Sequence, residues 1–166
     1  MRNLPLVLFM VLFAAAACLI SSLAEQLPEL VAVHFDAGGV ANGFTTREDC
    51  RMFMLTLTLG APVFILVVGA LIPRLLPPSM INIPNRAHWL APERAADSIA
   101  FLSEQGVWFA CIFIVFLAGV DWMLARANAT VPPAFPTRLF CWTLVLFFCA
   151  MGCWAIRMFR RFRAPP

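Results

Sequence analysis

The residues best suited to chemistry in this chain are His34 and Asp36, two positions apart in a polar segment, and Asp121 in an apolar one. A histidine beside a carboxylate can transfer protons or hold a metal ion. The same side chains can instead hydrogen-bond the glycine-rich turns that follow them, and we favour this structural interpretation because two ligands are too few for a metal site. The candidate ligand-binding set consists of His34, Asp36, Asn42 and Asp121. We expect no metal or other cofactor.

Asp121 is the one acidic residue in the apolar stretch between Glu104 and Arg126. Charged side chains inside a membrane are costly and often functional. Because Asp121 lies near one end of the stretch, we favour a structural pairing over a role in transport. The candidate partners are Arg51, Arg126, Arg138 and His34. Gln105, at the other end of the stretch, is expected to be exposed to water.

The six cysteines show no CxxC spacing and no cluster with histidine, so the sequence gives little support for a zinc or iron–sulfur site. Most of them lie in apolar stretches, where cysteine behaves as a small hydrophobic residue. Cys50 and Cys141 could form a disulfide, but nothing in the sequence fixes their separation. We find no nucleophile with a neighbouring base and no phosphate-binding loop, so we expect that the chain is not an enzyme.

The composition places these residues in a membrane protein. Of 166 residues, 62% are apolar and 13% are charged, whereas an average soluble domain has roughly 25% charged residues. A soluble fold this short needs a polar surface that the chain cannot supply. The composition excludes an ordinary cytosolic enzyme, a disordered chain and a nucleic-acid-binding module.

Four apolar stretches are long enough to cross a hydrocarbon core of about 30 Å. We therefore predict an all-α integral membrane protein, one domain over residues 1–166, with four transmembrane helices. The helices are expected near residues 4–24, 52–73, 105–125 and 139–157. The first stretch resembles a signal peptide, with Arg2 before it and Ser22–Ala24 near its end, but its long apolar core favours an uncleaved anchor.

Two features indicate how the helices pack. Ala14, Cys18 and Ser22 are spaced by four in the first helix and form a stripe of small residues, which allows close approach of a neighbouring helix in lipid. Pro62 lacks a backbone donor and is expected to kink the second helix.

Four spans place both termini on one side of the membrane, and the arginines indicate which side. All twelve basic residues are arginine. Eight of them lie on the side of the termini and four on the opposite side, and basic loops stay in the cytoplasm. We therefore predict cytoplasmic termini in contact with the lipid bilayer. The residues expected to bind anionic lipid, at about 1 kcal/mol per charge, are Arg157, Arg160, Arg161 and Arg163.

The outer loop, residues 25–51, is expected to be ordered over the outer ends of the helices. Alternating residues from Val31 to Asp36 predict a short extended segment, with Val31, Val33 and Phe35 on one face. Gly38–Gly39 and Asn42–Gly43 predict turns. A capping box then begins the second helix. The two candidate boxes are Thr45 with Glu48 and Thr46 with Asp49.

The inner loop, residues 74–104, contains four prolines that exclude a continuous helix. Pro92 and Glu93 suit the first turn of a new helix, which is expected to follow the membrane surface through Phe101 before the third span. A polar and aromatic patch here is equally suited to docking on the helix ends and to binding a cytoplasmic partner protein. Its residues are Asn82, Asn85, His88, Trp89, Glu93 and Arg94.

Both loops resemble those of a bacterial integral-membrane domain of unknown function, which also occurs at the N-terminus of Sdp-type immunity proteins. The outer motifs, in order, are Leu27–Pro28, Val33–Asp36, Gly38–Gly39 and Asn42–Gly43. The inner segments Asn82–Asn85 and Trp89–Arg94 are similar to a stretch of the same domain. Ala32 stands where the family often has proline, and four spans are fewer than the immunity proteins have.

The resemblance implies a non-enzymatic protein of the bacterial inner membrane that senses or blocks an extracytoplasmic ligand. Immunity proteins of this type protect a bacterium from its own peptide toxin and relay the toxin's presence to a repressor. Two alternatives stay open. One is an accessory subunit of a larger membrane complex. The other is a small transporter or membrane enzyme that uses His34, Asp36 and Asp121.

Overall fold

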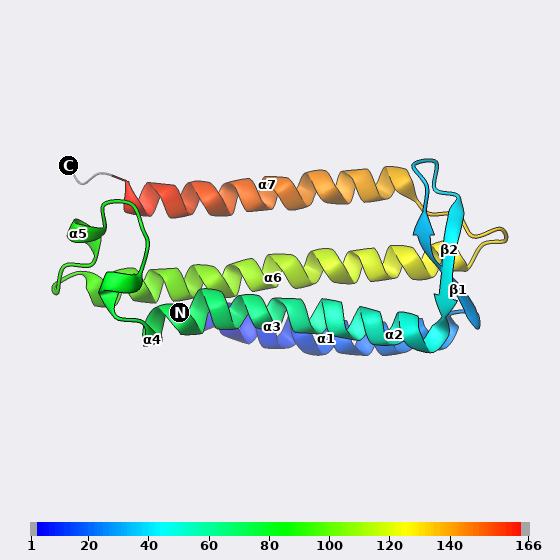
Figure 1. Cartoon of the computed structure of the whole chain (residues 1–166), viewed down its shortest axis with the longest axis horizontal. Helices are drawn as coiled ribbons and strands as arrows, with labels where there is room; N and C mark the ends of the chain where they lie inside the picture. The colour runs from blue at the N-terminus through cyan, green and yellow to red at the C-terminus, as the bar shows by residue number, and fades with distance from the viewer. Residues whose placement is uncertain (1–2, 164–166) are drawn as a thin grey trace.

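The computed structural model describes residues 3–163, and its long helices run along one common axis (Figure 1). Arg2, which contributes to the predicted charge asymmetry, lies outside the described residues. The segments long and apolar enough to cross a membrane are Leu4–Gln26 (α1), Arg47–Leu75, Ala95–Asn128 (α6) and Thr137–Phe162 (α7). Their number agrees with the four spans predicted from the sequence.

The second span is a continuous helical segment with two π-helical turns. Its parts are α2 (Arg47–Leu55), η1 (Thr56–Gly60), α3 (Ala61–Leu66), η2 (Val67–Leu71) and α4 (Ile72–Leu75). Of the two predicted capping boxes, Thr46 with Asp49 forms in part: the backbone N–H of Asp49 donates to Thr46 Oγ1 at 3.1 Å, and the Thr46 hydroxyl donates to Asp49 Oδ2 at 2.7 Å. Pro62 lies in the first turn of α3, directly after η1. The wider π turn makes room for a ring that would clash with a regular α-helical turn, so the helix continues past Pro62 to Leu75.

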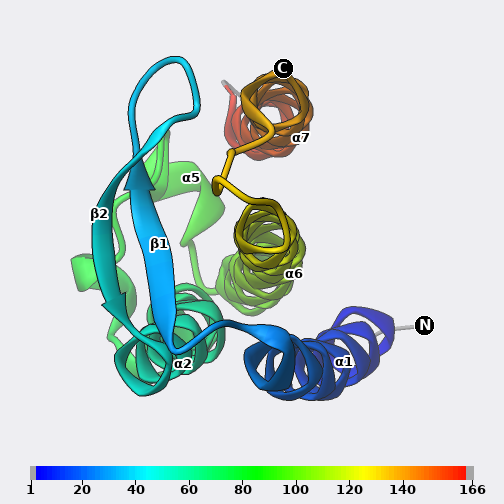
Figure 2. The ribbon, with the colours of Figure 1, turned by 90° about the vertical axis from the view of Figure 1, so that its right-hand side faces the viewer.

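Figure 2, seen along the axis, shows α6 between the α1–α2 pair on one side and α7 on the other. α1 packs on α6 through Phe9, which lies against Val107 and Cys111. The predicted small-residue stripe does not pack within the chain, because Ala14, Cys18 and Ser22 are exposed. The buried side chains of α1 lie on another face, and they include small Ala16 as well as large Phe9 and Ile20. α7 is the outlying helix, with Phe162 as its only buried residue in the described chain.

The chain between α1 and α2 forms a β-hairpin, so the fold is not wholly helical. β1 (Leu30–Phe35) pairs antiparallel with β2 (Ala41–Thr46). Register shifts on both sides of His34 interrupt the regular pairing. The predicted alternation is wrong, because Val31 and Ala32 are both buried, whereas Val33 and His34 are both exposed. The hairpin crosses from α2 toward α7 (Figure 2). We call this end of the molecule the hairpin end.

Gly39 allows the tip of the hairpin to meet the loop between α6 and α7. Its φ of +85° is in the left-handed region that favours glycine. A Cβ at this position would lie 2.6 Å from the backbone oxygen of Phe135, so the close approach also requires glycine.

The opposite end, which we call the terminal end, carries both described ends of the chain (Figure 1). Between α4 and α6 lie η3 (Pro78–Met80) and the short α5 (Arg86–Trp89). The predicted surface helix and third span are one helix, α6, which begins at Ala95 rather than Pro92. Ile99 and Phe101 pack around buried Phe162 of α7, so an unbroken helix buries side chains that the sequence assigns to the membrane surface.

Candidate functional site

The predicted outer ligand set is divided between the surface and the interior. His34 Nδ1 is hydrogen-bonded to Asn42 Oδ1 across the hairpin, and both residues are exposed. Asp36 Oδ1 accepts hydrogen bonds of 2.9 Å from the backbone N–H groups of Gly38 and Val40. Asp36 therefore holds the turn, as its structural interpretation predicts. None of these bonds involves Asp121.

Asp121 is buried between α6 and the second span, with 7% of its surface exposed. Its Oδ2 accepts a 2.7 Å hydrogen bond from the hydroxyl of Thr58, which is fully buried in the π turn η1. The predicted pairing is wrong, because every candidate partner is exposed and a neighbouring hydroxyl takes its place. Those exposed residues are Arg51, Arg126, Arg138 and His34. The structure does not bring His34, Asp36 and Asp121 together.

Asn128, the last residue of α6, fixes the hairpin to the helices. Its Oδ1 accepts from the backbone N–H of Ala32 at 2.8 Å, and its Nδ2 donates to the backbone oxygen of Ala32 at 2.9 Å. One side chain thus replaces a neighbouring strand for β1. The rings of Phe35 and Phe135, 5.1 Å apart, add a second attachment. The only sequence indication of this role is an amide residue at the end of the third apolar stretch.

The attached hairpin presents apolar and polar side chains side by side. Leu30, Val40 and Phe44 are 63%, 61% and 51% exposed. The hydrogen-bonded His34 and Asn42 lie on β1 and β2. Because Asn128 and Phe135 hold the backbone, this surface is ordered before any ligand arrives.

The predicted inner patch is partly docked on the end of α7. Asn85 Nδ2 donates to the backbone oxygen of Phe162 at 3.0 Å, and Trp89 Nε1 donates to that of Arg163 at 3.2 Å. Of the two uses proposed for the patch, docking is the one seen for these two residues. His88 stacks edge-on against Trp89, with ring centroids 4.7 Å apart.

The rest of the patch is available at the surface. Arg94 Nε donates to the backbone oxygen of His88 at 3.0 Å, and Glu93 and Arg94 are both exposed. Asn82 is also exposed and lines a cavity described below.

The four arginines expected to bind lipid differ in their surroundings. Arg157 Nη2 lies 3.8 Å from Glu104 Oε1. The guanidinium carbon of Arg161 lies 4.4 Å from the centroid of a Trp89 ring, within the range of a cation–π interaction. Arg160 and Arg163 are exposed, which leaves their charge free to meet anionic headgroups.

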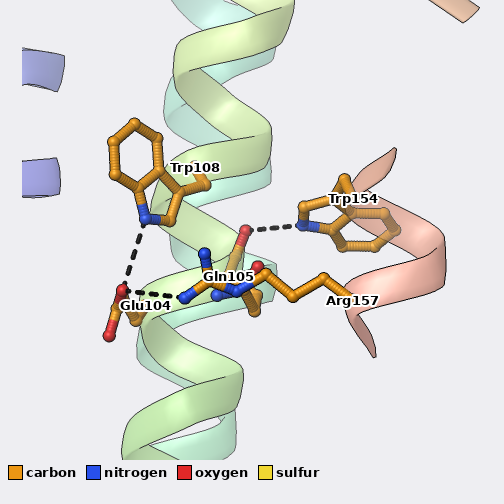
Figure 3. A network of polar contacts seen from close by, with 5 residues as sticks. All are labelled: Glu104, Gln105, Trp108, Trp154 and Arg157. Carbon is orange, nitrogen blue, oxygen red and sulfur yellow. Dashed lines mark hydrogen bonds and ion pairs between the residues drawn. The ribbon is translucent and has the colours of Figure 1, made fainter. Parts of the chain in front are cut away.

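Gln105 is buried in α6, with 1% of its surface exposed, so its predicted exposure to water is wrong. Figure 3 shows its surroundings. Trp154 Nε1 of α7 donates to the backbone oxygen of Gln105 at 3.0 Å, and Trp108 Nε1 donates to the adjacent Glu104 side chain at 3.3 Å. The buried side-chain Nε2 of Gln105 has no hydrogen-bond partner among residues 3–163.

Gln105 lines a cavity of about 550 Å³ between the second span, α6 and α7. Val68 lines it from the second span, Phe109 from α6 and Trp154 from α7. The segment around Asn82 lines its terminal end. No charged side chain is among the lining residues, and Gln105 and Asn82 are the polar ones.

The second span and α6 touch through their backbones at the edge of this cavity. A Cβ on Gly106 would lie 2.3 Å from the carbonyl carbon of Gly69. Gly69 belongs to the π turn η2. Each π turn of the second span therefore contacts α6: η1 through the bond from Thr58 to Asp121, and η2 through the close approach of Gly69 to Gly106. π turns occur frequently at functional sites.

Within residues 3–163, no three His, Cys, Asp or Glu side chains gather where they could hold a metal ion. Cys50 is buried, Cys141 is exposed, and both are free thiols. No family model, curated protein or solved structure matches this chain. The resemblance to the Sdp-type immunity family stays a prediction.

Proposed function

We propose that this chain is a non-enzymatic receptor of the bacterial inner membrane whose hairpin binds an extracytoplasmic ligand. The observation that supports it is an exposed, mixed apolar and polar hairpin surface on a backbone that Asn128 fixes to α6. A surface ordered in advance loses less conformational entropy when a ligand binds. A membrane-active peptide, with apolar side chains and backbone donors, fits Phe44 and the His34–Asn42 pair.

α6 gives this receptor a route across the membrane. It is a single helix of 34 residues, with Asn128 bound to the hairpin at one end. At the other end, the hydroxyl of Ser98 donates to the backbone oxygen of Trp89 at 2.7 Å. A ligand that shifts the hairpin would thus act on the segment that exposes Glu93 and Arg94, where we propose that a cytoplasmic partner binds.

Sensitivity to peptides tests the receptor function. The full chain is expressed in a bacterium that is sensitive to a panel of membrane-active peptides, and we expect protection against at least one of them. Joint substitution Phe44→Asp and His34→Ala should remove this protection. Val131→Asp should retain it, because Val131 is fully exposed but lies outside the hairpin. Immunoblots of membrane fractions check that the amounts of protein match.

Two results would count against the receptor proposal. One is unchanged sensitivity across the whole panel when the wild-type chain is expressed. The other is protection that survives both hairpin substitutions at equal protein levels, because the ligand would then act elsewhere.

A second function, accessory subunit of a larger membrane complex, is supported by α7. Phe148 and Phe159 of α7 are largely exposed, and Cys149 and Cys153, one turn apart, are exposed too. Small residues at this spacing allow another helix to approach closely in lipid. Purification in mild detergent tests this function: a larger protein should co-purify in fixed ratio, and a stable monomer alone would contradict it.

A further inference from the structure

We infer that the cavity beside Gln105 binds a neutral long-chain lipid whose carbonyl oxygen accepts a hydrogen bond from the Gln105 amide. This inference does not depend on the proposed receptor function, because the cavity lies between the helices and not on the hairpin. It is carried by three observations: an unpartnered buried amide, an apolar cavity of ligand size, and a lining without charge.

The Gln105 amide needs an acceptor that the described protein does not supply. Native structures pair nearly all buried donors, because an unpaired one destabilises the fold. Leu102, Gly106 and Phe109 also line the cavity, so Gln105 belongs to the face of α6 that meets this space.

The size and position of the cavity suit a hydrocarbon chain. Its volume of about 550 Å³ is within the range of small-molecule sites, roughly 300–1,000 Å³. Residues of the second span, α6 and α7 line it, and α6 lies between the other two helices (Figure 2). The rings of Phe109 and Trp154 stack at 5.2 Å and give it a flat aromatic wall. An acyl or isoprenoid chain would therefore be covered by apolar side chains.

The electrostatic surroundings select a neutral ligand. No charged side chain lines the cavity. Outside its lining, Arg157 lies 3.8 Å from Glu104, and Arg74 Nε donates to the hydroxyl of Ser103 at 2.9 Å. A carboxylate or phosphate inside the cavity would be desolvated without a cation. An ester or ketone oxygen needs only one donor, which Gln105 Nε2 can provide.

Photolabelling in a bilayer tests the inference. The full chain is reconstituted into phosphatidylethanolamine–phosphatidylglycerol vesicles that contain a monoacylglycerol with a diazirine in its acyl chain. After illumination, mass spectrometry should find adducts at the cavity, on Val68, Phe109 or Trp154. Unlabelled monoacylglycerol should compete, whereas the alkane of equal length and the free fatty acid at neutral pH should compete several-fold less. An isoprenoid quinone that competes more strongly supports the same site and assigns the carbonyl to a ketone.

Two variants separate binding from structure. Gln105→Leu keeps the volume and removes the amide, so labelling should fall roughly three- to thirty-fold, as for loss of one hydrogen bond in lipid. Its melting temperature should be unchanged or higher, because an unpaired donor is removed. Val68→Trp should fill the cavity and abolish labelling. Leu146→Trp is the matched control on the exposed side of α7, and it should label like wild type.

Several results would overturn the inference. These are full labelling of Gln105→Leu, full labelling of Val68→Trp, and competition by the alkane as strong as that by monoacylglycerol. Adducts spread evenly over the lipid-facing side of α7 would also overturn it, because they would report bulk lipid. A Gln105→Leu protein that unfolds would show a structural role for the amide and would contradict the expected stability.

Discussion

Asp121 and Thr58 form a buried hydrogen-bonded pair, and the two residues differ in whether another hydrogen-bond partner is at hand. The hydroxyl of Thr58 can find another acceptor on its own helix, because threonine commonly bonds a backbone carbonyl one turn earlier. The carboxyl of Asp121 has no such alternative, and it lies where water is scarce, with 7% of its surface exposed. Loss of the donor should therefore cost more than neutralisation of the acceptor.

The pair predicts an ordered series of stabilities. Thr58→Val should destabilise the protein by about 1–3 kcal/mol, because it leaves a buried polar group unpaired. Asp121→Asn keeps an acceptor for the Thr58 hydroxyl and should cost about 1 kcal/mol or less. The double variant Thr58→Val with Asp121→Leu should be more stable than Thr58→Val alone. Unfolding in mixed micelles, followed by circular dichroism, measures all three, and equal losses for the two single variants would contradict the series.

Asp121 and Gln105 show which features of single residues the sequence does not predict. The sequence identifies Asp121 as an unusual acid in an apolar stretch, but its partner is 63 positions away and depends on a π turn that no local pattern indicates. The prediction that Gln105 is exposed to water is wrong for a related reason. Its place beside charged Glu104 suggests a wet edge, whereas the continuation of α6 to Ala95 places it among packed helices.

At the scale of elements, the hairpin shows that one amide can order a whole segment. Apart from Asn128, β2 is the only regular partner of β1 among residues 3–163, and an isolated two-stranded hairpin is marginally stable in water. The two bonds between Asn128 and Ala32 extend its ladder by one position. The hairpin should therefore depend on a residue that is far from it in sequence.

Asn128→Ala is expected to loosen the hairpin without unfolding the helices. Two lost hydrogen bonds should destabilise the hairpin by about 1–3 kcal/mol, and amide hydrogen exchange from Leu30 to Thr46 should accelerate accordingly. Gln26→Ala is a matched control, because Gln26 Nε2 bonds only the backbone oxygen of Ser22 in its own helix. Exchange that stays slow in Asn128→Ala would contradict this role.

The crossing of α6 over η2 gives a second prediction at this scale. A Cβ at Gly106 would meet the backbone of Gly69, whereas a Cβ at Gly119 meets nothing within 4 Å. Gly106→Ala should therefore destabilise the protein by about 1–3 kcal/mol through overpacking. Gly119→Ala, in the same helix, should be neutral or stabilising by up to about 1 kcal/mol. Thermal unfolding of the two variants in detergent compares them directly, and equal effects would exclude the backbone contact.

Some elements form from local features of the sequence, whereas others depend on contacts between residues that are far apart in it. Apolar length predicts the four long helices, and the local chemistry of Thr46 and Asp49 predicts the start of the second one. The strand pairing and the irregular register at His34 depend on contacts with Asn128 and Phe135, more than ninety positions away. Alternation alone therefore could not predict that the consecutive residues Val31 and Ala32 are both buried.

The outlying helix, α7, is attached to the rest of the molecule near both of its ends. Near the hairpin end, the backbone N–H of Phe135 donates to Gly39 at 2.9 Å, just before α7 begins. At the terminal end, Asn85 and Trp89 bond the last turn of α7. Between them, Phe116 and Phe147 stack with ring centroids 4.4 Å apart. These attachments keep α7 beside α6 while its other face stays open to lipid or to another protein.

The distribution of charge over the two ends predicts how the molecule sits in a membrane. Among residues 3–163, seven arginines lie toward the terminal end and four toward the hairpin end, so the terminal end should remain in the cytoplasm. With the native cysteines replaced by alanine, Val131→Cys at the hairpin end should react with a membrane-impermeant maleimide in intact cells. Ser79→Cys at the terminal end should react only after permeabilisation. Both positions are exposed, so only the bilayer would keep the reagent away from position 79. The reverse pattern would place the hairpin in the cytoplasm and would contradict an extracytoplasmic ligand.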